Sequence, residues 1–140
     1  MKATIKWVKD AQFTATSGSG HTITVDGPPE IGGQNLGPRP MELMLLSVGA
    51  CSSVDVMLIL KKGRQQVTNC ECEVTSERAE TDPKVFTKIH LHFIVSGKDL
   101  AENQVKRAVD LSAEKYCSAS IMLGRGGVQI THGYEIRQTV

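Results

Sequence analysis

The sequence has no excess of charge of either sign, no apolar leader and none of the common catalytic motifs. Lysine and arginine number 16 against 15 acidic residues, so the net charge is +1. Binding to nucleic acid depends on clustered cations, so no nucleic-acid partner is expected. Charges interrupt the first ten residues, which argues against a signal peptide. H-E-x-x-H, Walker and G-x-S-x-G motifs are all missing.

The length and composition predict one globular domain over residues 1–140. Charged residues make up 22% of the chain and hydrophobic ones 40%, which argues against disorder. The longest apolar stretch, residues 41–60, contains Glu42 and Asp55 and is expected to be too polar to span a membrane. We therefore expect a cytoplasmic protein without a membrane partner, whose cysteines are reduced rather than paired in structural disulfides.

Alternation of polar and apolar residues predicts most of the strands. No βαβ alternation is recognisable, so the fold class expected is α+β with an antiparallel sheet. A glycine- and proline-rich loop over 27–40 is long for a compact domain, and such loops are often functional. The strands are expected as three short antiparallel ones within 2–26, then at 67–80, 85–95 and 128–136, with a hairpin turn at 82–84.

Two longer helices and a short one are predicted between these strands. The first runs from Met41 to about Lys62, with Pro40 at its first position. The second opens with a capping box of Asp99 and Glu102 and runs to about Tyr116. The inner stripe of this second helix is expected to consist of Val105, Ala108, Val109 and Ser112. Ser118 is expected to cap a short third helix that runs to Leu123.

The first helix is apolar on every face, which predicts burial on every face. One sheet and one other helix cannot cover it in so short a chain. If ten aliphatic side chains stayed exposed, the protein would lose on the order of 15–30 kcal/mol of hydrophobic stabilisation. We therefore expect a homodimer with an extensive apolar interface. The alternative is a monomer whose two-stranded segment wraps back over the helix.

The four cysteines are the candidate reactive groups. Cys51 is either a core residue or, if the helix restarts after Gly49, a thiol of lowered pKa at a helix N-terminus. Cys117, between two helices, is either a packing residue or reactive. Cys70 and Cys72 share a strand face and are expected to be ordinary core cysteines, since C-x-C alone is a weak zinc motif. His90 and His92 are expected on a solvated strand face, where they could bind metal only weakly.

Two segments around the cysteines form recognisable motifs. The first is Pro38-Arg39-Pro40-Met41-Glu42-Leu43 followed by Val48-Gly49-Ala50-Cys51. The second is Asp110-Leu111-Ser112-Ala113-Glu114-Lys115-Tyr116-Cys117. Both resemble segments of the OsmC/Ohr family, and the chain looks closest to its YhfA-like branch. The resemblance implies an OsmC-like fold, in which an antiparallel sheet wraps around long buried central helices, and an intertwined dimer with active sites at the subunit interface.

The resemblance also implies an activity, that of a thiol-dependent peroxidase acting on organic hydroperoxides, with hydrogen peroxide as an alternative substrate. Cys51 matches the peroxidatic cysteine and Cys117 the resolving cysteine, which would form a disulfide that an external dithiol reduces. Glu42 matches the supporting glutamate, and Arg39 is the nearest candidate for the arginine that pairs with the thiolate. No metal and no organic cofactor are expected.

Helix geometry limits how Glu42 can act on Cys51. Nine residues correspond to about 900° of rotation and about 13 Å along one straight helix, which places the two on opposite sides. They can share a site only if the helix breaks near Gly49 or if Glu42 comes from the other subunit. Two further functions stay open: a redox-sensing or small-ligand-binding module of the same fold, and a structural protein whose cysteines are all packing residues.

Overall fold

The computed structural model describes all residues from 1 to 140, and their contacts divide the chain into two compact units. The first unit comprises Met1–Leu45 and the second Leu46–Val140. Helix α1, Pro40–Lys62, begins in the first unit and belongs mainly to the second. The prediction of a single domain is not tested by this division, and we describe each unit by itself.

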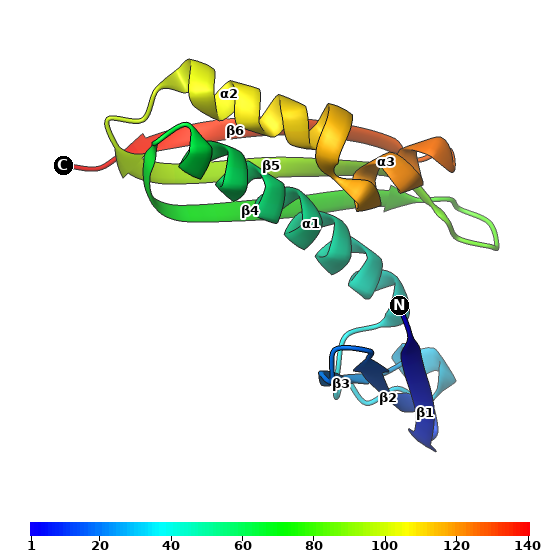
Figure 1. Cartoon of the computed structure of the whole chain (residues 1–140). Coiled ribbons are helices and arrows are strands. Elements are labelled where there is room, and N and C mark those ends of the chain that lie inside the picture. Colours follow the sequence, from blue (N-terminus) through cyan, green and yellow to red (C-terminus); the bar gives the residue numbers. More distant parts are fainter. The chain divides into compact units, whose positions relative to one another are not determined.

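The first unit is a small antiparallel sheet with the order β1-β2-β3. Its strands are β1 (Ala3–Lys9), β2 (Gln12–Ser17) and β3 (Thr22–Val25), so the three short strands predicted here are confirmed (Figure 1). The loop that follows includes the short helix η1 (Pro29–Ile31). The buried carboxylate of Asp26 orders it by accepting hydrogen bonds from the backbone N–H groups of Gly27, Gln34 and Leu36.

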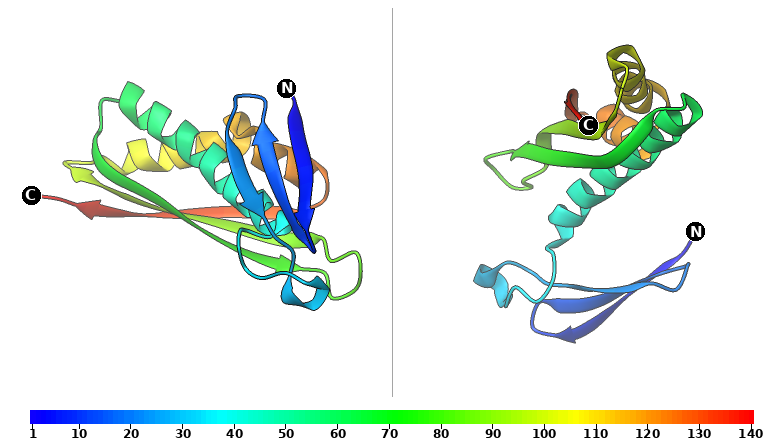
Figure 2. Two further views of the ribbon diagram at one scale, coloured as in Figure 1. Left: turned by 90° about the horizontal axis from the view of Figure 1, so that it is seen from below. Right: turned by 90° about the vertical axis from the view of Figure 1, so that its left-hand side faces the viewer.

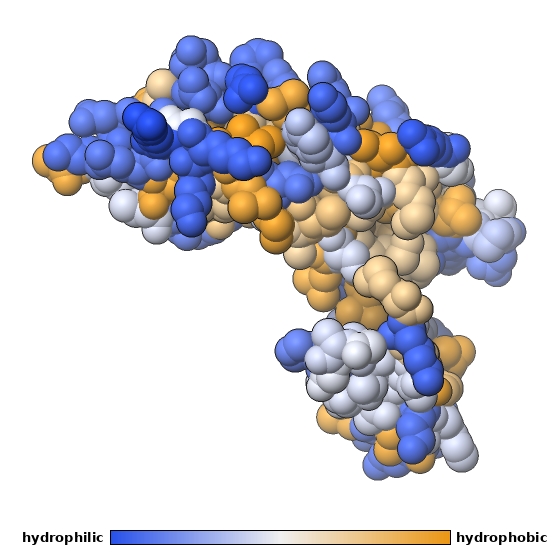
Figure 3. Space-filling view, in the orientation of Figure 1, coloured by the Kyte–Doolittle hydropathy of each residue, from blue (hydrophilic) through white to orange (hydrophobic).

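Helix α1 begins at Pro40, as predicted, and continues without a break to Lys62. A single chain covers only one stripe of it. Apolar side chains on the rest of the helix stay exposed, with 60% of Val54 and 53% of Leu58 accessible, and hydrophobic surface is visible along it (Figure 3). The buried stripe consists of Val48, Gly49, Ser52, Val56 and Leu60, spaced for one helix face.

The length and composition of α1 also match those of a membrane-spanning helix. Contrary to the expectation from the sequence, the helix is long and apolar enough to cross a membrane by those two criteria. One such helix is weak evidence for a membrane protein, because a core helix of a soluble protein meets the same criteria.

The second unit contains a three-stranded sheet with the order β4-β5-β6. Its strands are β4 (Gln66–Arg78), β5 (Phe86–Lys98) and β6 (Gln129–Gln138), close to the predicted ranges. β4 and β5 pair antiparallel, but β6 pairs parallel to β5. The expectation of antiparallel pairing is therefore wrong for β6. The chain between β5 and β6 is helical and returns along the sheet before β6 begins, which makes a parallel crossover (Figure 2).

All three helices of the second unit lie on one face of this sheet, so it forms two layers (Figures 1 and 2). The alternate side chains of β5 that face the helices are fully buried, namely Ile89, Leu91, Phe93 and Val95. Val85, where the predicted strand 85–95 begins, precedes the observed strand and is exposed. On the opposite face, His90 contacts Thr131 and His92 contacts Glu135.

The helices that follow β5 start and end differently from the prediction. Asp99 adopts a positive φ of 51° and caps nothing, so the capping box is wrong. The side-chain oxygen of Gln65 accepts the hydrogen bond of the Ala101 N–H group instead. The helical segments are α2 (Glu102–Leu111), the π-helical turn η2 (Ser112–Tyr116) and α3 (Ser118–Arg125), and the predicted inner stripe of α2 is buried.

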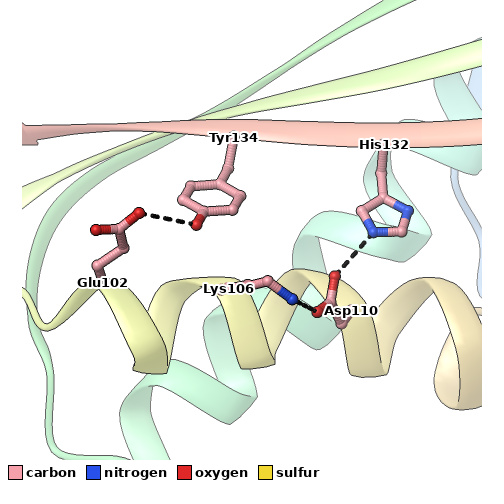
Figure 4. A network of polar contacts seen from close by, with 5 residues as sticks. All are labelled: Glu102, Lys106, Asp110, His132 and Tyr134. Atoms are coloured by element: carbon pink, nitrogen blue, oxygen red, sulfur yellow. Dashed lines mark hydrogen bonds and ion pairs between the residues drawn. The ribbon is translucent and has the colours of Figure 1, made fainter.

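Polar side chains tie α2 to β6 (Figure 4). Asp110 on α2 contacts Lys106 at 2.6 Å and His132 of β6 at 2.9 Å. Further along, the hydroxyl of Tyr134 donates to Glu102 over 3.2 Å. Lys106 and His132 hold the pKa of Asp110 below its usual range, so this carboxylate stays charged and fixes the position of α2 on the sheet.

Candidate active site

The second unit brings Cys51 and Cys117 together. Cys51 lies in the middle of α1, and Cys117 directly precedes α3. Their sulfur atoms, together with a carboxylate oxygen of Asp55, all lie within 4.8 Å of one another. Both thiols are free, Cys51 is half-buried and Cys117 is fully buried. The two predicted redox residues thus share one small cluster in a single chain.

Cys117, not Ser118, is the N-cap of α3. Its backbone is extended, with φ of −73° and ψ of 100°, and its sulfur accepts a hydrogen bond from the Ser120 N–H group over 3.4 Å. The predicted cap was one residue too late, because a sulfur atom can accept the bond that serine usually accepts. This arrangement places a sulfur at a helix N-terminus, where the backbone dipoles favour negative charge.

Two buried serines complete the surroundings of Cys117. The Ser52 hydroxyl donates to its sulfur over 3.0 Å, and the Ser112 hydroxyl donates to the Ser52 carbonyl over 3.2 Å. The N–H group of Cys117 in turn donates to the Ser112 carbonyl over 2.8 Å. Sequence reasoning assigned neither serine a role here. The sequence feature that could have identified them is a polar residue on a helix stripe expected to be buried, because a buried hydroxyl needs a hydrogen-bond partner.

The two thiols have pKa values shifted in opposite directions. Burial alone would raise the pKa of Cys117, but hydrogen bonds from Ser120 and Ser52 outweigh it and leave this pKa below the ordinary value. Burial raises the pKa of Cys51, and the neighbouring Cys117 adds to the rise, while the N–H group of Ala119 opposes it. These contacts favour negative charge on Cys117 over Cys51, and a hydrogen bond from the Cys51 thiol adds to this preference.

The unbroken course of α1 excludes the helix restart considered for Cys51. Gly49 does not interrupt the helix; it allows close packing, because a Cβ atom here would lie 2.9 Å from Cγ2 of Val74 on β4. The glycine that looked like a helix breaker is a contact point between α1 and the sheet.

Asp55 is a member of the cluster that the sequence did not reveal. It lies one helical turn after Cys51, and its Oδ2 atom is buried without a hydrogen-bond partner. Burial raises the pKa of this carboxyl group. An acidic residue four positions after a cysteine in an otherwise apolar helix is the signal that could have identified it.

A cavity of about 450 Å³ reaches this region of the second unit. Asp55, Leu58, Arg107 and Tyr116 are among the residues that line it. It combines apolar wall with a positive charge, which suits an organic molecule that carries a polar group.

The remaining cysteines lie on β4. Cys70 and Cys72 are half-buried rather than core residues, and both are free. Burial raises the pKa of Cys72 to about 11, and this thiol is close enough to Cys117 to respond to its charge. Neither sulfur belongs to the cluster of Cys51, Asp55 and Cys117.

Arg39 and Glu42 lie in the first unit, and both side chains are exposed. The carboxylate of Glu42 accepts a hydrogen bond from the Arg39 N–H group over 2.9 Å, which satisfies a backbone donor at the start of α1. Their predicted roles toward Cys51 stay predictions.

Comparisons with known proteins agree with the fold. The family model described as OsmC-like protein matches residues 32–133. Protein YhfA of Escherichia coli K12 is 52% identical over 136 residues, which cover 97% of this chain and 98% of that protein.

Solved structures of other proteins have the same fold. A hypothetical protein from Aquifex aeolicus VF5 aligns with a TM-score of 0.86 at 31% identity, covering 99% of this chain and 97% of the other. An organic hydroperoxide resistance protein from Elizabethkingia anophelis aligns with a TM-score of 0.70 at 16% identity, covering 98% and 94%. At that identity, the second likeness is one of fold alone.

Proposed function

The chain belongs to the OsmC-like family, and from this premise we propose that it is a thiol-dependent peroxidase that reduces organic hydroperoxides. The observation that carries the proposal is the meeting of the Cys51 and Cys117 sulfur atoms, which come from different helical segments. Its fold likeness to an organic hydroperoxide resistance protein supports the choice of substrate class.

Cys51 is the sulfur that attacks the peroxide in this proposal, because Cys117 is fully buried and Cys51 is not. The Cys51 thiolate forms a bond to one peroxide oxygen as the O–O bond breaks. The alcohol leaves after its oxygen takes up a proton, and Cys51 becomes a sulfenic acid. The Cys117 thiolate then attacks the Cys51 sulfur, the S–O bond breaks, and the hydroxide that leaves takes up a proton from solvent to become water as the disulfide forms. An external dithiol reduces the disulfide by two exchange steps.

The shared hydrogen bond between the thiols supplies the required proton movement. In this proposal the first negative charge rests on Cys117, whose pKa is lowered, and Cys51, whose pKa is raised, holds the remaining proton. Transfer of this proton to Cys117 produces the reactive Cys51 thiolate without a solvent base. The later attack by Cys117 requires the reverse charge, which its hydrogen bonds from Ser52 and Ser120 favour.

The proposal is tested by the consumption of cumene hydroperoxide by the reduced protein with dithiothreitol as the dithiol. Cys51→Ser should abolish turnover, and Cys117→Ser should allow one oxidation of Cys51 without rapid turnover. Cys70→Ser is the matched control and should retain the activity. Mass spectrometry should find a Cys51–Cys117 disulfide after one equivalent of peroxide. Equal losses in Cys51→Ser and Cys70→Ser, or no such disulfide, would contradict the proposal.

A redox sensor or ligand-binding module is the second candidate, and the raised pKa of Cys51 favours it. A thiol that is mostly protonated reacts slowly with peroxide, so oxidation could occur without efficient turnover. Stopped-flow measurement of Cys51 oxidation separates the two functions. A rate no higher than that of free cysteine favours the sensor, and a much higher rate favours the peroxidase.

A homodimer in the cytoplasm completes the proposal. The exposed apolar side chains of α1, including Leu46, Val54 and Leu58, would be covered by a second subunit. Because α1 is continuous, Glu42 and Arg39 would act on the Cys51 of the other subunit rather than on their own. Arg39→Ala should then slow the oxidation of Cys51. Four free cysteines are in keeping with a reducing compartment.

A further inference from the structure

The cluster of Cys51, Asp55 and Cys117 contains three side chains that can each ligate a metal ion. One ligand atom from each residue lies within 4.8 Å of the other two. Oδ2 of Asp55 is buried and has no hydrogen-bond partner, which is costly for a carboxylate in an apolar helix. We propose that the reduced protein binds one Zn²⁺ ion per chain through these three residues.

The spacing of the residues suits a tetrahedral ion. Cys51 and Asp55 are four positions apart on α1, which places them on the same helix face, and Cys117 faces them from the start of α3. Zinc binds thiolate sulfur at about 2.3 Å and carboxylate oxygen at about 2.0–2.2 Å, so neighbouring ligands lie about 3.5–3.8 Å apart. Ligand atoms within 4.8 Å therefore need to approach by at most about 1.3 Å.

The donor set selects zinc over the abundant hard cations. Two sulfur ligands disfavour Mg²⁺ and Ca²⁺, which prefer oxygen, while thiolate with one carboxylate suits Zn²⁺. Three protein ligands leave a fourth position for water or another small ligand, as in open zinc sites.

The surroundings supply the outer hydrogen bonds that such sites use. The Ser52 hydroxyl and the Ser120 N–H group both donate to the Cys117 sulfur, which orients it and stabilises its negative charge. The Ser112 hydroxyl holds the Ser52 carbonyl. These contacts keep Cys117 in place whether or not an ion is present.

Zinc binding and disulfide formation exclude each other, because both use the same two sulfur atoms. The zinc-bound thiolates would be shielded from peroxide, and their oxidation to a disulfide, with the two electrons going to the peroxide, would release the Zn²⁺ ion unchanged. The zinc site rests on the geometry of the cluster and does not depend on the proposed peroxidase activity.

The experiment is a titration of the full-length reduced protein with Zn²⁺ against a chromophoric chelator. We expect one Zn²⁺ ion per chain, and a Co²⁺-loaded sample should show a thiolate-to-metal charge-transfer band and the intense visible bands of a tetrahedral site. Cys51→Ser, Cys117→Ser and Asp55→Asn should each weaken Zn²⁺ binding at least about ten-fold. Cys70→Ser, which removes a thiol outside the cluster, is the matched control and should bind as the parent protein does.

Asp55→Asn is the decisive variant, because it keeps both sulfurs and the shape of the side chain. Unchanged zinc affinity in Asp55→Asn would overturn the proposal, as would equal loss in Cys70→Ser and Cys51→Ser. A circular dichroism spectrum and a urea unfolding midpoint like those of the parent protein would show that Asp55→Asn is folded. Should peroxide form no disulfide in the parent protein while zinc still requires all three residues, the peroxidase fails and the zinc site stands.

Discussion

Replacing Gly49 by alanine should destabilise the protein, although the same change usually stabilises a helix. In a helix interior, alanine is favoured over glycine by up to about 1 kcal/mol. At Gly49 the added Cβ would lie 2.9 Å from Cγ2 of Val74, closer than carbon atoms approach without strain. Overpacking of this kind costs about 1–3 kcal/mol. The net expectation is a loss of up to about 2 kcal/mol, because the cost of the contact exceeds the gain in helix propensity over most of this range.

Urea unfolding followed by circular dichroism, at one fixed protein concentration, measures this loss. Gly124→Ala is the control, since a Cβ on this α3 residue meets nothing within 4 Å and only the helix preference should appear. Val74→Ala removes the opposing methyl groups, so it should partly rescue Gly49→Ala in the double variant. If Gly49→Ala stabilises the protein as Gly124→Ala does, α1 does not pack closely on β4 at this point, and the position of Cys51 beside Cys117 loses its structural basis.

Three further perturbations probe the interface, the α2–β6 contact and the first unit. Leu58→Asp places a charge on the exposed apolar face of α1 and should shift the protein from dimer to monomer in sedimentation equilibrium, whereas an unchanged mass would place the interface elsewhere. The folded-state pKa of Asp110 is lowered, so its contribution to stability is fully present above its unfolded pKa of about 3.9 and is lost as the pH falls through the lowered value. Asp110→Asn should flatten the decline in urea midpoint below about pH 4, and an identical decline would contradict this assignment. Asp26→Ala removes the acceptor of three backbone N–H groups, so amide hydrogen exchange in the loop 27–40 should become faster while exchange in β5 stays slow.

The secondary structure could be predicted largely from the sequence because its signals are local. Alternation of side chains identified the strands, and Pro40 marked the start of α1. The errors occurred where a distant residue took over a local role. Asp99 was expected to cap α2, but Gln65 from another part of the chain satisfies the backbone there. The antiparallel expectation failed for β6 because strand direction depends on how the intervening helices return along the sheet.

The candidate site was only partly predictable. Cys51 and Cys117 were identified through the family resemblance, but nothing in their local sequence required the two sulfurs to meet. The sequence allowed a helix break at Gly49 that would place Cys51 at a helix N-terminus, whereas in the structure Cys117 lies at a helix N-terminus. Asp55 was seen only as a polar interruption of an apolar helix, and its place beside both thiols emerged from the packing of α1 against α3.

By itself the sequence determined the order of strands and helices, the apolar character of α1 and the membership of two cysteine segments in a known family. Each of these depends on neighbouring residues or on matched motifs. The tertiary structure alone decided which cysteine has hydrogen bonds that lower its pKa, how close Asp55 comes to both sulfurs and that β6 runs parallel to β5. These properties depend on burial and on hydrogen bonds between segments far apart in the chain, and such contacts exist only once the helices have packed on the sheet.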